Sequence, residues 1–163
     1  MSSSTAQTVE FELTANEGSI RIAVERIRRG NVRAEAILRG WEPGRCPEPE
    51  RRKERRRGLV LGAFLIPVEV EGSRARALGE NETQLPVLTR DISPHGIGFQ
   101  HDCPLPVRHG VLQFDLWGDG MVELLVEQKW TRVTGGTAFR HLSGSRIVAV
   151  AREATASDER ASW

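Results

Sequence analysis

Two stretches of this chain carry polar side chains in an order and spacing suited to a small anionic ligand. The first is the basic run RRKERRR at residues 51–57, in which arginines recur four residues apart. The planar fork of an arginine can bond two parallel acceptors, either phosphate oxygens or O6 and N7 of guanine, and the same plane can stack on a base. Two arginines at i and i+4 lie on one side of a turn, so we expect such a pair to contact one ligand.

The second stretch is DISPHG at residues 91–96, which has the pattern D-x-S-x-x-G. Short side chains such as those of Asp91 and Ser93 bond to nearby N–H groups and hold a turn, and Pro94 fixes φ. The carboxylate of Asp91 can also accept hydrogen bonds from N–H groups of a ligand. Ser93 could add a hydroxyl or backbone contact, and Gly96 lets the backbone come closer to a ligand than a Cβ would allow.

Strands must position this turn. Residues 85–90 predict a strand that enters it, and residues 96–101 predict a strand that leaves it. Upstream, the apolar residues 59–71 predict a strand from Phe64 onward, and residues 72–84 predict a polar loop.

Further strands are predicted downstream of the turn. Residues 110–116 alternate between an exposed face at odd positions and a buried face at even positions. Residues 121–133 predict a long strand, residues 137–142 predict its return, and residues 147–151 predict either a last strand or the start of a terminal helix. About six short strands with Gly-rich turns indicate a closed antiparallel barrel over residues 64–142. Its expected core includes Ile66, Val68, Val70, Leu88, Ile97, Phe99, Leu112, Phe114, Leu116 and Trp130.

Residues 9–38 admit two interpretations. Residues 9–13 alternate like a strand and so do residues 20–24, which together would make a hairpin. The apolar residues between 20 and 27 also form a helical stripe that Gly30 would end. The length of the segment and its alanines favour a helix, and residues 32–38 could form a second, short one. Such a helix either packs on the barrel or docks on a partner, and packing on the barrel is the simpler interpretation.

A basic run, a strand and then D-x-S-x-x-G, in that order, resemble the PilZ family of cyclic di-GMP receptors. The resemblance covers residues 51–150 and implies a mainly β fold, a six-stranded antiparallel PilZ-type β-barrel with an N-terminal helical appendage. It also implies cyclic di-GMP as the ligand, no cofactor and no catalysis, and it points to a bacterial protein. The ligand-binding residues that the resemblance implies are Arg51, Arg52, Arg55, Arg56, Asp91, Ser93 and Gly96.

In that family the arginines lie on a flexible segment just before the first strand and fold over the ligand. The closest match to the family's R-R-x-x-x-R pattern is Arg51-Arg52-x-x-x-Arg56, and Arg51-x-x-x-Arg55 is a second, overlapping register. Between the arginines and the first strand this chain is a few residues longer than the usual pattern, and the apolar residues 58–62 replace a more polar approach. The arginine register therefore stays open.

The resulting organisation has four parts. They are an N-terminal segment (1–40) with a disordered start, a Pro-rich linker (41–50), the barrel with its basic segment (51–150) and a polar tail (151–163). In one interpretation the protein is a cyclic di-GMP receptor or adaptor that changes conformation or partner contacts on binding. In the other, a PilZ-like barrel has lost the ligand and acts as a protein–protein interaction module. The presence of the Arg, Asp, Ser and Gly residues favours the first.

The composition limits the classes of partner and the cellular compartment that we expect for this protein. A net charge of +1 provides no global field for a nucleic-acid polymer, because the positive charge is concentrated in one run. Two cysteines are too few for a disulfide framework and predict free thiols in a reducing cytoplasm. No signal peptide, long apolar stretch or lipidation motif is present, so we expect a cytoplasmic protein without a membrane partner. A protein partner of unknown identity is expected, and monomer and homodimer both stay open.

The sequence lacks the residue patterns that metal binding, nucleophilic catalysis or ATP and NAD binding would require. His95, His101, Cys103 and His109 fit no common closed zinc site, so no metal is expected. A nucleophilic serine or cysteine would have neither an oriented base nor an oxyanion hole, and no Gly-rich loop of the P-loop or dinucleotide type occurs. Trp130 could stack on a base, although a Trp in a strand more often lies in a core.

We predict that residues 47–59 are mobile without ligand, because clustered like charges repel and few apolar groups anchor them. Hydrogen exchange in this segment should slow when cyclic di-GMP is added. Equal exchange rates with and without saturating ligand would contradict a segment that grips the ligand.

Overall fold

The fold is mainly β with one helix near the N-terminus, which confirms the predicted fold class at that level. The structure, a computed structural model, describes residues 9–39, 57–58, 61–78, 84–105, 107–116, 120–134 and 139–154. The predicted linker at 41–50 and the arginines at 51, 52, 55 and 56 lie outside the described residues.

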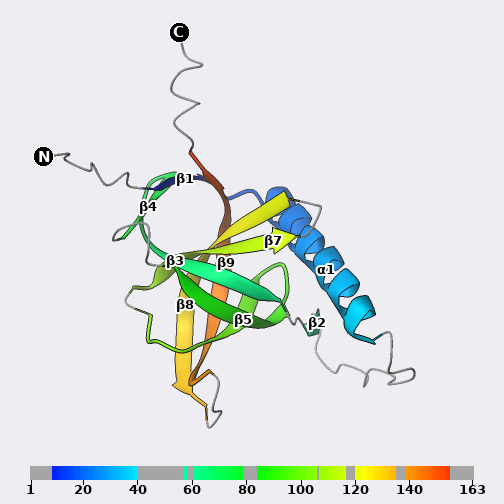
Figure 1. Ribbon diagram of the computed structural model, residues 1–163. Coiled ribbons are helices and arrows are strands. Elements are labelled where there is room, and N and C mark those ends of the chain that lie inside the picture. The colour runs from blue at the N-terminus through cyan, green and yellow to red at the C-terminus, as the bar shows by residue number, and fades with distance from the viewer. Residues whose placement is uncertain are drawn as a thin grey trace, which may run out of the picture.

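The described residues form nine strands and one helix (Figure 1). In chain order these are β1 (Glu10–Thr14), α1 (Glu17–Arg39), β2 (Arg57–Gly58), β3 (Gly62–Glu71), β4 (Arg74–Ala77), β5 (Leu85–Ile92), β6 (Gly96–His101), β7 (His109–Leu116), β8 (Gly120–Val133) and β9 (His141–Glu153). The nine strands belong to one sheet, and the pairings between them are antiparallel.

The strand pairings close on themselves. β3 pairs with β7, β7 with β8, β8 with β9, β9 with β6, β6 with β5, and β5 pairs again with β3. β1 pairs with β9 and β4, and β4 pairs with β3, so these two strands close a second circuit on the same four strands. Strands β3, β7, β8 and β9 are therefore shared between two circuits.

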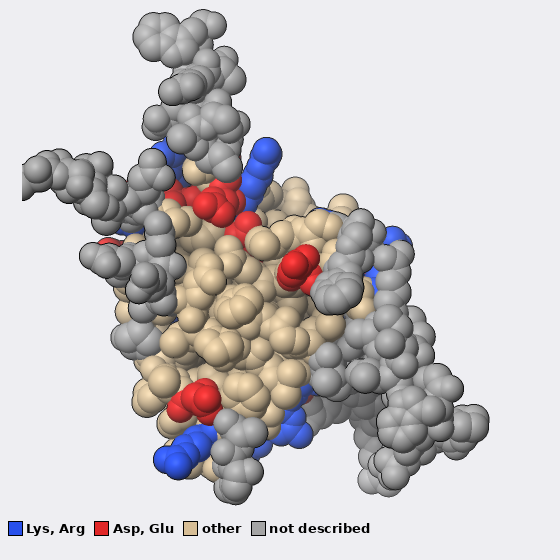
Figure 2. Space-filling model, in the orientation of Figure 1, with Lys and Arg blue, Asp and Glu red and all other residues tan. Residues whose placement is uncertain are grey.

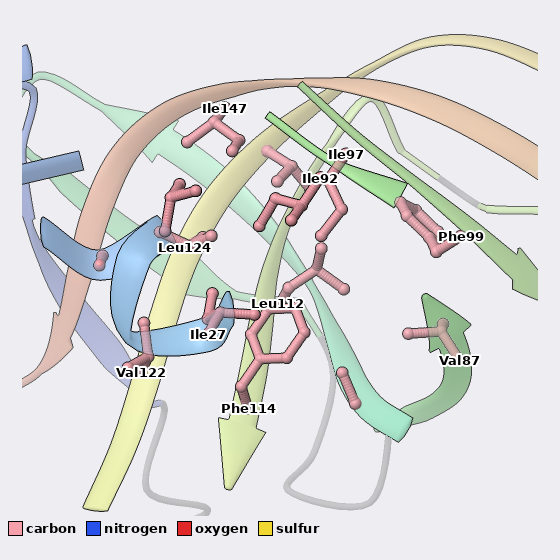
Figure 3. Close-up of a cluster of buried hydrophobic side chains, with 14 of the residues drawn as sticks. Ile27, Val87, Ile92, Ile97, Phe99, Leu112, Phe114, Val122, Leu124 and Ile147 are labelled. Atoms are coloured by element: carbon pink, nitrogen blue, oxygen red, sulfur yellow. The ribbon is translucent and has the colours of Figure 1, made fainter. Parts of the chain in front are cut away.

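Each circuit has its own set of buried apolar side chains. The main core, part of which is drawn in Figure 3, comprises Ile20, Ala23, Val24, Ile27, Ala63, Leu65, Val87, Ile92, Ile97, Phe99, Leu112, Phe114, Leu116, Val122, Leu124, Val126 and Ile147. The second core comprises Phe11, Ile66, Val68, Ala75, Val111, Leu125, Ala149 and Ala151. The four shared strands contribute side chains to both cores. Each of their two faces is therefore at least partly covered.

Strand β7 shows the effect of the shared position. Phe114 faces the main core, as predicted, but Val111 is 0% exposed in the second core and Gln113 is also buried. The prediction of an exposed face at the odd positions is therefore wrong except at Asp115. The two faces of β7 alternate as predicted, but the second circuit of strands covers most of the face that was predicted to be exposed.

The structure corrects one predicted loop and decides between two alternatives predicted for residues 147–151. The loop predicted at 72–84 contains β4, which returns from β3 through a tight turn where Gly72 has a φ of 60°. Residues 147–151 belong to β9 and form a strand, which was one of the two predicted outcomes.

Most of the predicted core side chains are buried. The exceptions are Val70 and Leu88, which are half-buried, and Trp130, which is 46% exposed. Along β5, Val87 faces the main core in place of Leu88, and the register with β6 shifts between Thr89 and Asp91. This shift lets Ile92 face the core as well, although it stands an odd number of residues from Val87.

The N-terminal segment contains a strand and a helix. The strand interpretation holds for β1 but is wrong for residues 20–24, which belong to α1 as the helical interpretation predicted. Asn16 caps the helix, because its Oδ1 accepts hydrogen bonds from the N–H groups of Gly18 (2.8 Å) and Ser19 (3.4 Å). The predicted stop at Gly30 and the separate second helix are wrong, since α1 continues to Arg39. A Cβ at Gly30 would lie 2.8 Å from Cδ2 of Leu116, so this glycine permits close packing of the helix on β7.

The apolar stripe of α1 belongs to the main core. Ile20, Ala23, Val24 and Ile27 are all buried there, and Figure 3 shows Ile27 beside side chains of β7. The stripe therefore packs on the strands, as the simpler interpretation held. Ile22, on the other side of the helix, is 67% exposed.

Charged side chains are spread unevenly over the described surface. On the face in Figure 2, which β3 crosses, Lys, Arg, Asp and Glu side chains lie mostly near the margins. Phe64 of β3 is 49% exposed. The middle of this face therefore offers few charged groups to an anionic ligand.

We predict that Ile27→Ala lowers the free energy of unfolding by about 2–5 kcal/mol, because it leaves a cavity in the main core. Ile22→Ala, a matched change on the exposed side of the same helix, should alter it by less than about 0.5 kcal/mol. Urea denaturation of the two variants measures both values. Equal losses would mean that α1 is not an integral part of the core.

Candidate functional site

The D-x-S-x-x-G stretch forms the predicted tight turn between β5 and β6. The Ser93 hydroxyl oxygen accepts hydrogen bonds from the N–H groups of His95 (3.3 Å) and Gly96 (3.2 Å). The N–H of Ser93 donates to the main-chain oxygen of Gly96 at 2.8 Å. Ser93 is buried, so its hydroxyl holds the turn in this structure.

The turn is also anchored on β9. The N–H of Ile147 donates to the main-chain oxygen of His95 at 2.9 Å. A Cβ at Gly96 would lie 3.0 Å from the main-chain oxygen of Ser145, which is tighter than an ordinary contact. Gly96 therefore serves the close approach of the turn to β9.

Asp91 lies across from Gly98, its register partner on β6. Asp91 Oδ1 accepts a hydrogen bond from the Gly98 N–H at 3.0 Å. A Cβ at Gly98 would lie only 2.7 Å from that oxygen, so the glycine makes room for the carboxylate. Gly98, which lies two residues beyond the D-x-S-x-x-G pattern, is therefore also part of the candidate site.

The end of the basic run lies directly beside this turn. In β2, Gly58 pairs with Asp91 and Arg57 pairs with Ile92. The two stretches that the sequence analysis selected are therefore adjacent at this point, although they are far apart in the chain. The predicted ligand-binding arginines precede β2, at 51, 52, 55 and 56, and lie outside the described residues.

A single row of paired residues crosses four strands at the level of Asp91. Asp91 on β5 pairs with Gly98 on β6, Gly98 with Gly144 on β9, and Gly144 with Trp130 on β8. Directly paired residues project from the same face of a sheet. We call Asp91, Gly98, Gly144 and Trp130 the glycine row. Three strand spacings separate its ends, or about 14 Å.

Trp130 closes the far end of the glycine row. Its ring stands over Gly144, where a Cβ would overlap Nε1 and Cε2 of the indole. The guanidinium of Arg132 lies 5.2 Å from the ring centroid, within range of a cation–π interaction. The ring is half exposed and lies on the outer face, where the core prediction did not place it.

Positive charge gathers next to the row. Glu127 accepts hydrogen bonds from Lys129 (3.1 Å) and Arg146 (3.2 Å), and Arg108 lies 3.9 Å from it. The hydrogen bond from Lys129 is the main cause that lowers the pKa of Glu127. Arg146 pairs in register with Gly96 of the turn. Three cations around one carboxylate leave a local excess of positive charge that would attract an anion.

His101, considered for a metal site, has a structural role. It is 1% exposed, its Nδ1 lies 2.6 Å from the main-chain oxygen of Cys103, and its Nε2 lies 2.6 Å from the Ser143 hydroxyl. Burial lowers the pKa of His101 and favours the neutral ring, in which Nδ1–H donates to the carbonyl and Nε2 accepts from the serine. Among the described residues, no three His, Cys, Asp or Glu side chains are grouped to hold a metal ion.

Comparisons of the chain with protein-family models, with curated proteins and with solved structures give no match. In the part of the chain that the structure describes, no helix has the length and apolar character needed to cross a membrane.

We predict that Gly144→Ala displaces the Trp130 ring and lowers the free energy of unfolding by about 1–3 kcal/mol, because the new methyl group overlaps the indole. Gly62→Ala is the matched control, since a Cβ there meets nothing within 4 Å. The indole N–H resonance of Trp130, assigned with Trp130→Phe, should move in the first variant and stay in place in the second. An unmoved resonance in Gly144→Ala would contradict the contact.

Proposed function

We propose that this protein is a receptor for cyclic di-GMP, built on a PilZ-type barrel whose six strands are those of the main-core circuit. One observation carries the proposal: β2 places the end of the basic run against Asp91 and Ile92 of the D-x-S-x-x-G turn. The two motifs that resemble the family are adjacent there, as a shared ligand requires.

The glycine row fits one guanine of the ligand. The Asp91 carboxylate lies over Gly98 and the Trp130 ring lies over Gly144, so a base can stack on the exposed face of the indole with its edge toward the carboxylate. The carboxylate of Asp91 accepts from guanine N1–H and N2–H₂ while it keeps its bond to Gly98, because a carboxylate has about four lone-pair sites. Asp91 and Trp130 then recognise the base from opposite ends of the row.

The arginines supply the remaining contacts. In the proposed complex Arg51, Arg52, Arg55 and Arg56 reach the phosphates and the second guanine with their planar forks. Ser93 and Gly96 act mainly by holding the turn, as their hydrogen bonds support. The cations around Glu127 add a field that favours approach of the anionic ligand.

In this proposal, ligand binding changes the conformation of the protein or the contacts that it makes with a partner, without catalysis. We place this receptor in the bacterial cytoplasm, in keeping with the free thiols that the sequence predicts for its two cysteines. The second candidate is a ligand-free PilZ-like interaction module. It is favoured by the engagement of the Ser93 hydroxyl within the turn, where it serves structure.

Calorimetric titration with cyclic di-GMP tests the proposal. Arg52→Ala, Arg56→Ala and Asp91→Ala should each weaken binding by about 1–3 kcal/mol, or roughly tenfold to a hundredfold in Kd. Trp130→Ala should cost a similar amount through the lost stacking. Arg52→Lys should recover little, because an ammonium cannot form the bidentate fork.

Arg57→Ala is the control for the arginine register and should weaken binding less. Thermal melts must show that each variant is folded, since Asp91→Ala also removes the bond to Gly98. Loss of binding in Arg57→Ala with retention in Arg52→Ala would show that the register is wrong. If the parent protein gives no heat of binding, the interaction-module candidate replaces the receptor.

A further inference from the structure

The side chain of Arg28 connects helix α1 to the D-x-S-x-x-G turn. Its Nη2 donates a hydrogen bond to the main-chain oxygen of Ile92 at 3.4 Å. Ile92 stands in the chain between Asp91 and Ser93, the two polar residues of the motif. Arg28 could not be identified from the sequence, because nothing in its helical position shows which strand it reaches.

Three parts of the fold meet at Ile92. Its side chain is 0% exposed and lies in the main core together with Ile27 of α1. Its main chain pairs with Arg57 in β2 and with Ile97 in β6. A displacement of β2 or of the turn therefore acts directly on the carbonyl group that Arg28 contacts.

The Arg28 guanidinium is incompletely satisfied where it lies. Its side chain is 21% exposed, and Nη1 is 4.0 Å from Oε2 of Glu25. Its buried Nε has no hydrogen-bond acceptor among the described residues. A buried donor without a partner is unfavourable, so a rearrangement that supplies an acceptor would be stabilised. A small shift of the Arg28 guanidinium between α1 and the turn therefore changes the stability of both elements.

We propose that Arg28 is a positioning residue that couples α1 to the ligand site, so that occupation of the site is transmitted to the helix. This inference rests on the proposed function. Cyclic di-GMP contacts Asp91, Asp91 directly precedes Ile92 and both pair with β2, and the main-chain oxygen of Ile92 holds Arg28. The helix becomes more firmly attached to the strands when the ligand is bound.

The outer side of α1 is the surface that this coupling controls. Ile22 is 67% exposed there, and Arg21, Glu25 and Arg29 are exposed around it. The ligand thus acts on a surface on the opposite side of the helix from its own site.

The coupling is reciprocal, because a ligand that stabilises the attached helix must bind better when the helix is attached. Couplings of this kind typically change affinity by about 5-fold to 150-fold. Arg28→Met tests it, since methionine keeps an unbranched apolar stem and removes the N–H donors. Arg29→Met is the matched control: Arg29 lies on the same helix and 3.9 Å from the same Glu25, but its side chain is 71% exposed.

Hydrogen exchange of the full chain, with and without saturating cyclic di-GMP, gives the decisive measurement. In the parent and in Arg29→Met, ligand should slow exchange of the α1 amides by about fivefold or more. In Arg28→Met this slowing should be lost, and calorimetry should show a Kd raised by about fivefold or more. Ligand-induced slowing in Arg28→Met equal to that of the parent would overturn the inference.

A ligand-free comparison separates this inference from the proposed function. Without ligand, Arg28→Met should speed exchange of the amides at residues 91–98, whereas Arg29→Met should not. If the parent binds no cyclic di-GMP, the proposed function fails, and this comparison alone decides the coupling of helix and turn. Faster exchange in Arg28→Met supports the coupling, and equal exchange in the two variants refutes it. Thermal melts of both variants exclude general unfolding as the cause.

Discussion

Four strands that carry apolar side chains toward both sides are the constraint on which the remainder of the fold depends. β3, β7, β8 and β9 contribute to two cores, and apolar surface left in water would destabilise them by about 25 cal/mol per Å². β5, β6 and α1 cover one side, and β1 and β4 cover the other. The N-terminal residues described here therefore complete both cores, through α1 in one and Phe11 of β1 in the other.

The parts of the fold that follow from local pattern could be predicted from the sequence. The strand–turn–strand unit around residues 91–96 was correct because Asp91 and Ser93 make hydrogen bonds within that unit. The errors arose where a distant element decided the outcome. Gly30 predicts the end of a helix, whereas its close contact with Leu116 on β7 explains why a glycine stands there. The two-sided burial of β7 likewise depends on strands far away in the chain.

Trp130 shows why part of the candidate site could not be predicted. The core was expected for this ring because a Trp in a strand more often lies in a core, but the register with β9 shifts between Gln128 and Trp130. A slip of one residue moves every later side chain to the other face of a sheet. The shift also aligns Trp130 with Gly144 and, through Gly98, with Asp91. Glycines on two neighbouring strands were the only trace of this arrangement in the sequence.

The greater length of β8 has a consequence for how copies of the protein behave toward one another. β7 pairs with β8 only as far as Glu127, whereas β9 accompanies β8 to Val133 (Figure 1). Beyond Glu127, no strand in the described ranges covers the outer edge of β8. An open edge is a template for intermolecular β-pairing, and natural proteins protect such edges with charged side chains. Lys129 and Arg132 are exposed along this edge, so mutual repulsion between copies opposes aggregation there.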